Sequence, residues 1–140
     1  MKSEKAVTLT SLIIYVTIMC VVVSIITVLT TYFNKNVINV SNSANSYKQY
    51  TKFNSYFVQD INLSNNAIIE CSENYVVFSS GNQYTFQNNS IYFNKVKICT
   101  DLKQCTFAQS TDTNGNEIVT VNIVTDNDKT FSLNYVIKSW

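Results

Sequence analysis

The most restrictive feature of this chain is a long uncharged segment near its N-terminus. No charged residue lies between Lys5 and Lys35, and the stretch from Leu12 to Leu29 consists mainly of Leu, Ile, Val, Met and Tyr. The hydrocarbon core of a bilayer is about 30 Å thick and is crossed by roughly 20 apolar helical residues. Backbone groups in lipid must be hydrogen-bonded within the segment, so we expect a helix despite the many β-branched residues. The segment predicts a single membrane span.

Two other interpretations of this segment are less favoured. A buried helix of a soluble domain rarely contains about 18 or more uncharged apolar residues in a row. A cleaved secretory signal peptide has a shorter apolar stretch of about 7–15 residues, followed by a small-x-small cleavage site. The residues from Thr31 to Lys35 contain no such site. We therefore expect the segment to be retained in the membrane.

Flanking charges leave the orientation of the span undecided. Lys2 and Lys5 precede it, with Glu4 between them, whereas Lys35 and Lys48 follow it. The excess of lysines that marks a cytoplasmic flank is therefore weak on both sides. Because the N-terminal tail is so short, we place it in the cytoplasm and the C-terminal part outside the cell membrane.

Helical periodicity continues beyond the apolar segment. From residue 34 to about Leu63, apolar residues recur in steps of three and four while Asn, Ser, Lys and Gln fill the other faces. They are Val37, Val40, Ala44, Tyr47, Tyr50, Phe53, Phe57 and Ile61. Asn and Ser are poor helix formers, but the sustained period outweighs their propensity. We predict one long helix, with its first half in lipid and its amphipathic second half against a partner surface.

The remainder of the chain has the pattern of short strands. β-branched and aromatic runs alternate with Asn-, Ser- and Gly-containing turns. The predicted strands are Ala67–Cys71, Tyr75–Ser79, Gln83–Gln87, Ser90–Asn94, Val96–Cys99, Cys105–Ala108, Glu117–Thr125 and Thr130–Lys138. We expect an α+β fold in which the amphipathic half of the helix packs on an antiparallel β meander, and Trp140 closes the core or its rim.

Composition argues against several functions of the external part. The chain contains no His, so Ser-His-Asp and Cys-His catalytic arrangements are impossible, and we expect no enzyme activity and no cofactor. Asn34 to Trp140 carries eight lysines and eight carboxylates, so charge does not support DNA binding. The local cluster of Lys95, Lys97 and Lys103 is typical of a solvated strand face.

Cysteines and acidic turns are the remaining candidates for chemistry. Cys20 lies in the predicted span, whereas Cys71, Cys99 and Cys105 lie outside, where disulfides persist. A five-residue link suggests a hairpin that brings Cys99 and Cys105 within bridging range, with Cys71–Cys99 and Cys71–Cys105 as alternatives. Three cysteines without His do not support zinc. The turn at 126–128 could hold Ca²⁺, but a solvated hairpin turn is favoured.

The residues before the apolar segment carry a resemblance. They read Lys5-Ala6-Val7-Thr8-Leu9-Thr10-Ser11-Leu12-Ile13-Ile14. This is similar to the processing site of type IV prepilins and type II secretion pseudopilins, which have a short basic leader, a small residue, a bulky residue, Thr, Leu and a long apolar helix. The resemblance implies that a prepilin peptidase cuts between Ala6 and Val7 and methylates the new amine of Val7.

The resemblance extends to the whole arrangement. The chain looks like minor pilins and pseudopilins of the PilW and J-pseudopilin type and of Gram-positive competence systems. Three segments carry it: Phe57–Ile61, the paired strands Tyr75–Phe78 and Tyr84–Tyr92, and the closing Ile137–Trp140. It implies a leader at 1–6, a transmembrane and assembly helix at 7–33, an amphipathic extension at 34–63 and an extracellular β domain at 64–140.

Two positions depart from the family pattern. Ala6 stands where the family usually has Gly, and Ser11 stands at the fifth mature position, where major pilins have Glu. A carboxylate in an apolar phase is costly unless it is paired, and the family is thought to pair it with the N-terminal amine of a neighbouring subunit. Ser11 cannot form that ion pair. We expect a subunit used in few copies, at the filament tip or in the initiating complex.

Two functions follow from these observations. The first is a minor pilin-like subunit of a type IV pilus, a secretion pseudopilus or a competence pseudopilus, held by lipid before assembly and by other pilin subunits on the cell surface afterwards. The alternative is a signal-anchored, single-pass surface protein whose β domain binds a ligand and never polymerises. Intact mass or N-terminal sequencing separates them.

Overall fold

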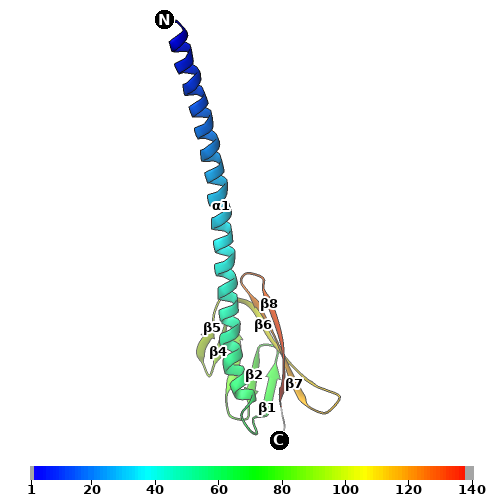
Figure 1. Ribbon diagram of the computed structural model, residues 1–140. Helices are drawn as coiled ribbons and strands as arrows, with labels where there is room; N and C mark the ends of the chain where they lie inside the picture. The colour runs from blue at the N-terminus through cyan, green and yellow to red at the C-terminus, as the bar shows by residue number, and fades with distance from the viewer. Residues whose placement is uncertain (1, 138–140) are drawn as a thin grey trace. The chain divides into compact units, whose positions relative to one another are not determined.

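The computed structural model describes residues 2–137, with side chains from Thr8 onward, and contains one long helix followed by strands (Figure 1). Helix α1 (Lys2–Ile61) ends two residues before the predicted boundary at Leu63. The predicted closing residues from Lys138 to Trp140 lie outside the described part. The chain divides into two compact units, one up to Ser41 and one from Asn42 onward. The second unit contains the end of α1 and all strands of the described chain.

The first sheet is a five-stranded antiparallel meander in which neighbours in sequence are neighbours in space. Its strands are β1 (Ile68–Ser72), β2 (Tyr75–Phe78), β3 (Gln83–Gln87), β4 (Ser90–Phe93) and β5 (Val96–Cys99). Two-residue turns join β3 to β4 and β4 to β5, with positive φ at Asn88, Asn89, Asn94 and Lys95. Turns of this kind suit the twist of a hairpin, and Asn tolerates the left-handed conformation. The Asn-rich turns therefore set where the β3–β4 and β4–β5 hairpins begin.

A second sheet is formed by β6 (Leu102–Thr111), β7 (Glu117–Thr125) and β8 (Thr130–Ile137), in that order. The prediction of antiparallel strands is confirmed, but a single continuous meander is not what forms. The chain leaves the first sheet after Cys99, and Asp101 has a φ of 59°. The amide of the next residue, Leu102, then donates to the carbonyl of Asn89. Strand β6, which starts at Leu102, pairs with β7 and not with β5.

One core is shared by the helix and both sheets. Phe57 of α1 is fully buried, and its ring centroid lies 5.6 Å from that of Phe78 in β2, 5.0 Å from Tyr84 in β3 and 4.8 Å from Tyr135 in β8. Phe53, one turn earlier, is equally buried and stacks on Phe57 at 5.0 Å. Because aromatic side chains bury the largest apolar areas, these two residues dominate the attachment of the helix. The α+β fold with the helix packed on antiparallel sheets is confirmed.

Candidate functional site in the apolar helix and its seam with the sheets

The first unit presents an apolar helical surface on every side. Its large apolar side chains from Leu9 to Phe33 are between 47% and 71% exposed. By length and composition α1 can cross a membrane once, with a mean hydropathy of 2.9 in its most apolar window. Soluble monomers rarely expose so much contiguous apolar area, so lipid or other apolar helices are needed to cover it. These features support a single-pass membrane protein.

Polar side chains in this apolar helix satisfy their own hydrogen bonds. Each of five hydroxyls donates to the backbone carbonyl four residues earlier, over 2.8–2.9 Å. The donors are Thr17, Ser24, Thr27, Thr30 and Thr31. Unsatisfied hydroxyls are costly in hydrocarbon, and this local bonding removes the cost without an outside partner. The interruptions in the apolar run are therefore compatible with lipid on all sides.

The predicted processing residues lie at the start of α1. The backbone at Ala6 and Val7 is helical, and their side chains lie outside the described part. The Leu9 side chain is 60% exposed, and Ser11 is half-buried. Cleavage between Ala6 and Val7 and the assembly roles of Thr8, Leu9 and Ser11 stay predictions.

The amphipathic stripe packs on the sheets over only part of its predicted length. Val37, Val40 and Tyr47 are between 63% and 69% exposed, although the stripe predicted that they would face a partner surface. Contact with the sheets is made by later members, of which Phe53 and Phe57 are fully buried. The stripe therefore has a free apolar section and a packed section.

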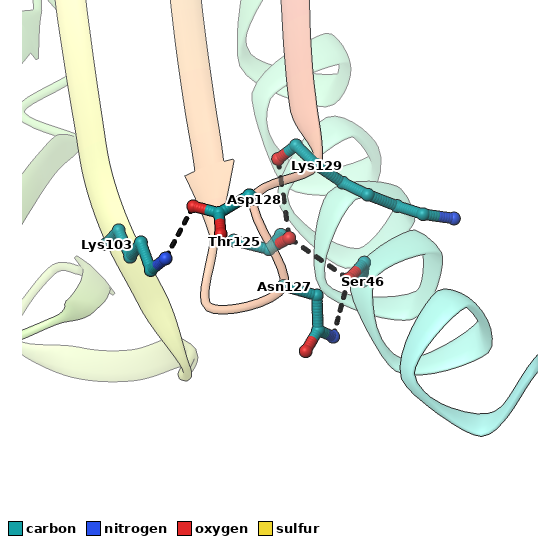
Figure 2. A network of polar contacts seen from close by, with 6 residues as sticks. All are labelled: Ser46, Lys103, Thr125, Asn127, Asp128 and Lys129. Atoms are coloured by element: carbon teal, nitrogen blue, oxygen red, sulfur yellow. Dashed lines mark hydrogen bonds and ion pairs between the residues drawn. The ribbon is translucent and has the colours of Figure 1, made fainter. Parts of the chain in front are cut away.

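A polar seam runs along the packed section beside the aromatic residues. It consists of Ser46, Gln49, Asn54 and Asp60, each hydrogen-bonded to a strand or a strand connection. Ser46 is 2% exposed, and its hydroxyl lies 3.0 Å from Thr125 Oγ1 at the end of β7. Asn127 Nδ2 donates to Ser46 Oγ over 3.3 Å and to the carbonyl of Asn42 over 3.1 Å. Figure 2 shows this corner, in which the β7–β8 turn reaches the helix.

The middle of the seam contacts both sheets. Gln49 Oε1 accepts from the amide of Thr100 over 3.1 Å, in the link between β5 and β6. Asn54 Oδ1 accepts from the hydroxyl of Tyr135 over 2.7 Å. Burial raises the pKa of the Tyr135 phenol, since ionisation would place a charge in the core. The helix is therefore held to the second sheet by Asn54 and to the inter-sheet link by Gln49.

A buried carboxylate closes the seam at the end of α1. Asp60 is 4% exposed; its Oδ2 accepts from Tyr84 OH over 2.5 Å and its Oδ1 from Asn82 Nδ2 over 2.6 Å. Asn66 Nδ2 donates to the Asp60 carbonyl over 2.8 Å. Burial, followed by the hydrogen bond to Asp60, raises the pKa of Tyr84 well above its ordinary value. In the described chain every buried side-chain N or O atom has a partner, and both side-chain oxygens of Asp60 are hydrogen-bonded.

The acidic turn at 126–128 is a hairpin turn, as favoured by its sequence. Asp128 pairs with Lys103 at 2.5 Å on the surface, and Asn127 is committed to the helix. Within residues 8–137 no group of three His, Cys, Asp or Glu side chains is placed to hold a metal ion. Lys97 lies in β5 and Lys103 in β6, so the lysine cluster of the sequence is divided over two sheets.

The three cysteines of the second unit are thiols in this structure. Cys99 and Cys105 are 1% and 0% exposed and belong to the same core, although they lie in different sheets and no hairpin joins them. Burial raises the pKa of Cys99 to about 11, and burial and nearby Cys99 raise that of Cys105 further. The Cys99 thiol donates to the carbonyl of Gln49 over 3.3 Å. A bridge between Cys99 and Cys105 stays a prediction, and burial makes both thiols unreactive as they stand.

Comparison with known proteins adds no relative. No protein family model, curated protein or solved structure matches this chain. What is established is a pilin-like arrangement: a long apolar N-terminal helix followed by antiparallel strands. The seam residues Ser46 and Asp60 were not expected from the sequence. One signal was available, because a carboxylate in the last turn of a helix opposes the helix dipole and needs specific partners.

Proposed function

We propose that this chain is a minor pilin-like structural subunit of a type IV pilus, a secretion pseudopilus or a competence pseudopilus. The observation that carries the proposal is that one helix is apolar on every side over Leu9–Phe33 and then supplies core residues Phe53 and Phe57 to a β domain. An ordinary signal anchor needs no such continuity, since a flexible linker would serve. A subunit that places its domain on a helical filament does need it.

The proposed role is assembly, without catalysis or a cofactor. The partners are other pilin-like subunits, a prepilin peptidase and membrane lipid before assembly. In this proposal the leader faces the cytoplasm, the β domain is extracellular, and the peptidase removes residues 1–6. The free apolar section of the stripe, which includes Val37 and Val40, extends the surface available to neighbouring helices beyond Phe33.

Intact mass and N-terminal sequencing of the native protein test the proposal. The expected product starts at Val7 with an N-methyl group. A matched Ala6→Asp variant, which places a charge beside the cut, is expected to stay at full length in the membrane. A native protein that retains Met1 to Ala6 would instead favour the signal-anchored surface protein that does not polymerise.

We base the proposed position of the subunit, at the filament tip or in the initiating complex, on Ser11. Because Ser11 has no carboxylate to pair with a neighbouring amine, the subunit is suited to the tip or to initiation, where one neighbour is missing. Immunogold labelling is expected to mark one end of each filament. Ser11→Glu is expected to move label into the shaft or to impair initiation. Labelling along the whole shaft, unchanged by Ser11→Glu, contradicts this position.

A further inference from the structure

The outward face of the five-stranded sheet carries an ordered row of side chains that the core does not use. Register pairs Tyr75 with Thr85, Thr85 with Tyr92, and Tyr92 with Lys97 across β2, β3, β4 and β5. Side chains alternate along each strand, and the neighbours Val76, Tyr84 and Ile91 are fully buried on the inner face. The row therefore lies on the face away from α1, on four consecutive strands.

A shallow hollow of about 350 Å³ lies on this face. It is lined by Gln83, Thr85, Gln87, Tyr92 and Lys95. Two carboxamides, a hydroxyl, a phenol and an ammonium group thus converge, and no carboxylate is among them. Carboxamides and hydroxyls both donate and accept hydrogen bonds. The hollow is suited to a ligand that also presents both donors and acceptors.

Tyrosines stand at two positions of the row. Tyr75 and Tyr92 are separated by two strand spacings, roughly 9–10 Å. Lys97 Nζ lies 5.7 Å from the ring centroid of Tyr92, a cation–π contact that restrains this ring. The Tyr75 hydroxyl donates to the Glu70 carboxylate. Both rings are thus held by a neighbouring side chain, and half-exposed aromatic rings in fixed positions lose little entropy on binding.

Lys95 reaches the hollow from an unusual backbone position. Its φ is 71°, in the left-handed region, where Gly or Asn is preferred for the second residue of such a turn. Lysine makes this turn less stable than Gly would, because a side chain disfavours the left-handed conformation. Residues kept in such sparsely populated conformations concentrate at binding sites. The backbone conformation of Lys95 is an observation separate from the row, and Lys95 lines the same hollow.

We propose that this face binds a glycan chain, with sugar rings stacked on Tyr92 and Tyr75 and sugar hydroxyls bonded to Gln83, Gln87 and Lys95. The apolar face of a pyranose ring packs on an aromatic ring, and its hydroxyls match carboxamides. A nucleic acid strand would also stack, but it requires a cationic track along its phosphates. Here Lys97 is engaged with Tyr92, and Glu70 stands at the other end of the row. The proposal does not depend on filament assembly.

Binding to the full-length protein in a detergent without sugar headgroups tests the proposal. One ligand is a soluble hexamer of β-1,4-linked N-acetylglucosamine, whose binding is measured by calorimetry. The other is insoluble peptidoglycan, whose binding is measured by co-sedimentation. At least one is expected to bind. Tyr92→Ala is expected to weaken that binding about tenfold, the order of one aromatic contact. Tyr47→Ala, an exposed tyrosine on α1, is the matched control and is expected to leave it unchanged.

A second variant separates loss of the site from loss of the fold. Lys95→Gly relieves the left-handed backbone, so its thermal midpoint is expected to be equal to or above that of the unchanged protein. Its glycan binding is nevertheless expected to fall several-fold. Failure of both glycan ligands to bind overturns the proposal. Salt-dependent binding of oligo-dT without glycan binding overturns the proposal in favour of single-stranded nucleic acid. Glycan binding that is unchanged in Tyr92→Ala shows that the glycan does not bind at this face.

Discussion

The hydroxyl groups of Ser46 and Thr125 share a hydrogen bond 3.0 Å long across 79 positions of sequence. One belongs to α1 and the other to the last residue of β7, so this bond joins the helix to the second sheet. Both residues are about 2% exposed. Water therefore cannot replace either partner freely, and the contact contributes to stability.

Ser46→Ala is expected to lower the free energy of unfolding by about 1 kcal/mol, the usual net value of one buried hydrogen bond. The loss stays modest because Thr125 Oγ1 also donates to Lys129 O, and Asn127 keeps Asn42 O. Urea unfolding of the detergent-solubilised chain measures it. Ser41→Ala, at an exposed helical serine, controls for the gain in helix propensity. A double-mutant cycle with Thr125→Val that gives no coupling would contradict a direct contact.

Asp60→Ala is expected to be the most damaging change at a polar residue of the seam. It leaves Tyr84 OH and Asn82 Nδ2 without their carboxylate, and removing a buried charged acceptor of two bonds costs about 3 kcal/mol. Thermal unfolding followed by circular dichroism reports the loss. The matched control is Asp126→Ala at an exposed turn position, for which we expect a change within about 0.5 kcal/mol. Equal effects of the two changes would refute the role of burial.

Alkaline pH is expected to destabilise the second unit. Folding raises the pKa of Cys99 from 9.0 to about 11 and raises those of Cys105, Tyr84 and Tyr135. A raised folded-state pKa means that the unfolded chain loses its proton first. The stability is therefore complete below about pH 8 and falls as the pH rises past 9, where unfolded thiols ionise, and past 10, where unfolded tyrosines do.

The slope of this decline identifies the groups. Each such group contributes up to about 1.4 kcal/mol per pH unit between its unfolded and folded pKa. Unfolding free energies of the reduced protein, measured from pH 7 to 11, are expected to fall less steeply above pH 10 in Tyr84→Phe. A decline that starts below pH 8, or one that Tyr84→Phe leaves unaltered, would count against this account.

Thiol alkylation tests the pairing of the cysteines in the second unit. In reduced protein, Cys71 is half-buried and is expected to react with a water-soluble maleimide before Cys99 and Cys105, which are buried and have raised pKa values. In protein isolated under oxidising conditions, peptide mass spectrometry is expected to find Cys99 joined to Cys105, with Cys71 reduced. Cys71→Ser should leave that bridge intact. A bridge that contains Cys71 would show that one of the alternative pairings is correct.

Much of the fold follows from local patterns in the sequence. The Asn88-Asn89 turn and the alternation in Glu117–Thr125 are strong local signals. Strands β3 and β7 have the predicted bounds, and β4 starts at Ser90 as predicted but ends one residue early, at Phe93. The division into two sheets was missed because Val96–Cys99 and Cys105–Ala108 have the same strand character. What separates them is the left-handed backbone of Asp101, a residue that carries no strong turn signal by itself.

The candidate site was less predictable than the fold. Periodicity marked Phe53 and Phe57 as core residues, and both are fully buried. Periodicity also assigned Ser46 and Asn54 to the solvated face of the helix, since polar residues at those steps are usually exposed. Their partners, Thr125 and Tyr135, are far away in sequence, and no local rule connects them. Long-range polar pairs of this kind depend on tertiary packing alone.

The burial of Phe53 and Phe57 has a mechanical consequence. These residues belong to the same continuous helix as the apolar segment, and no flexible link intervenes to stretch first. A pull along α1 must therefore shear both rings out of their contacts with two sheets at once, together with the hydrogen bonds of the seam. Tension on the helix is thus resisted by many contacts that must break together, and not by one bond at a time.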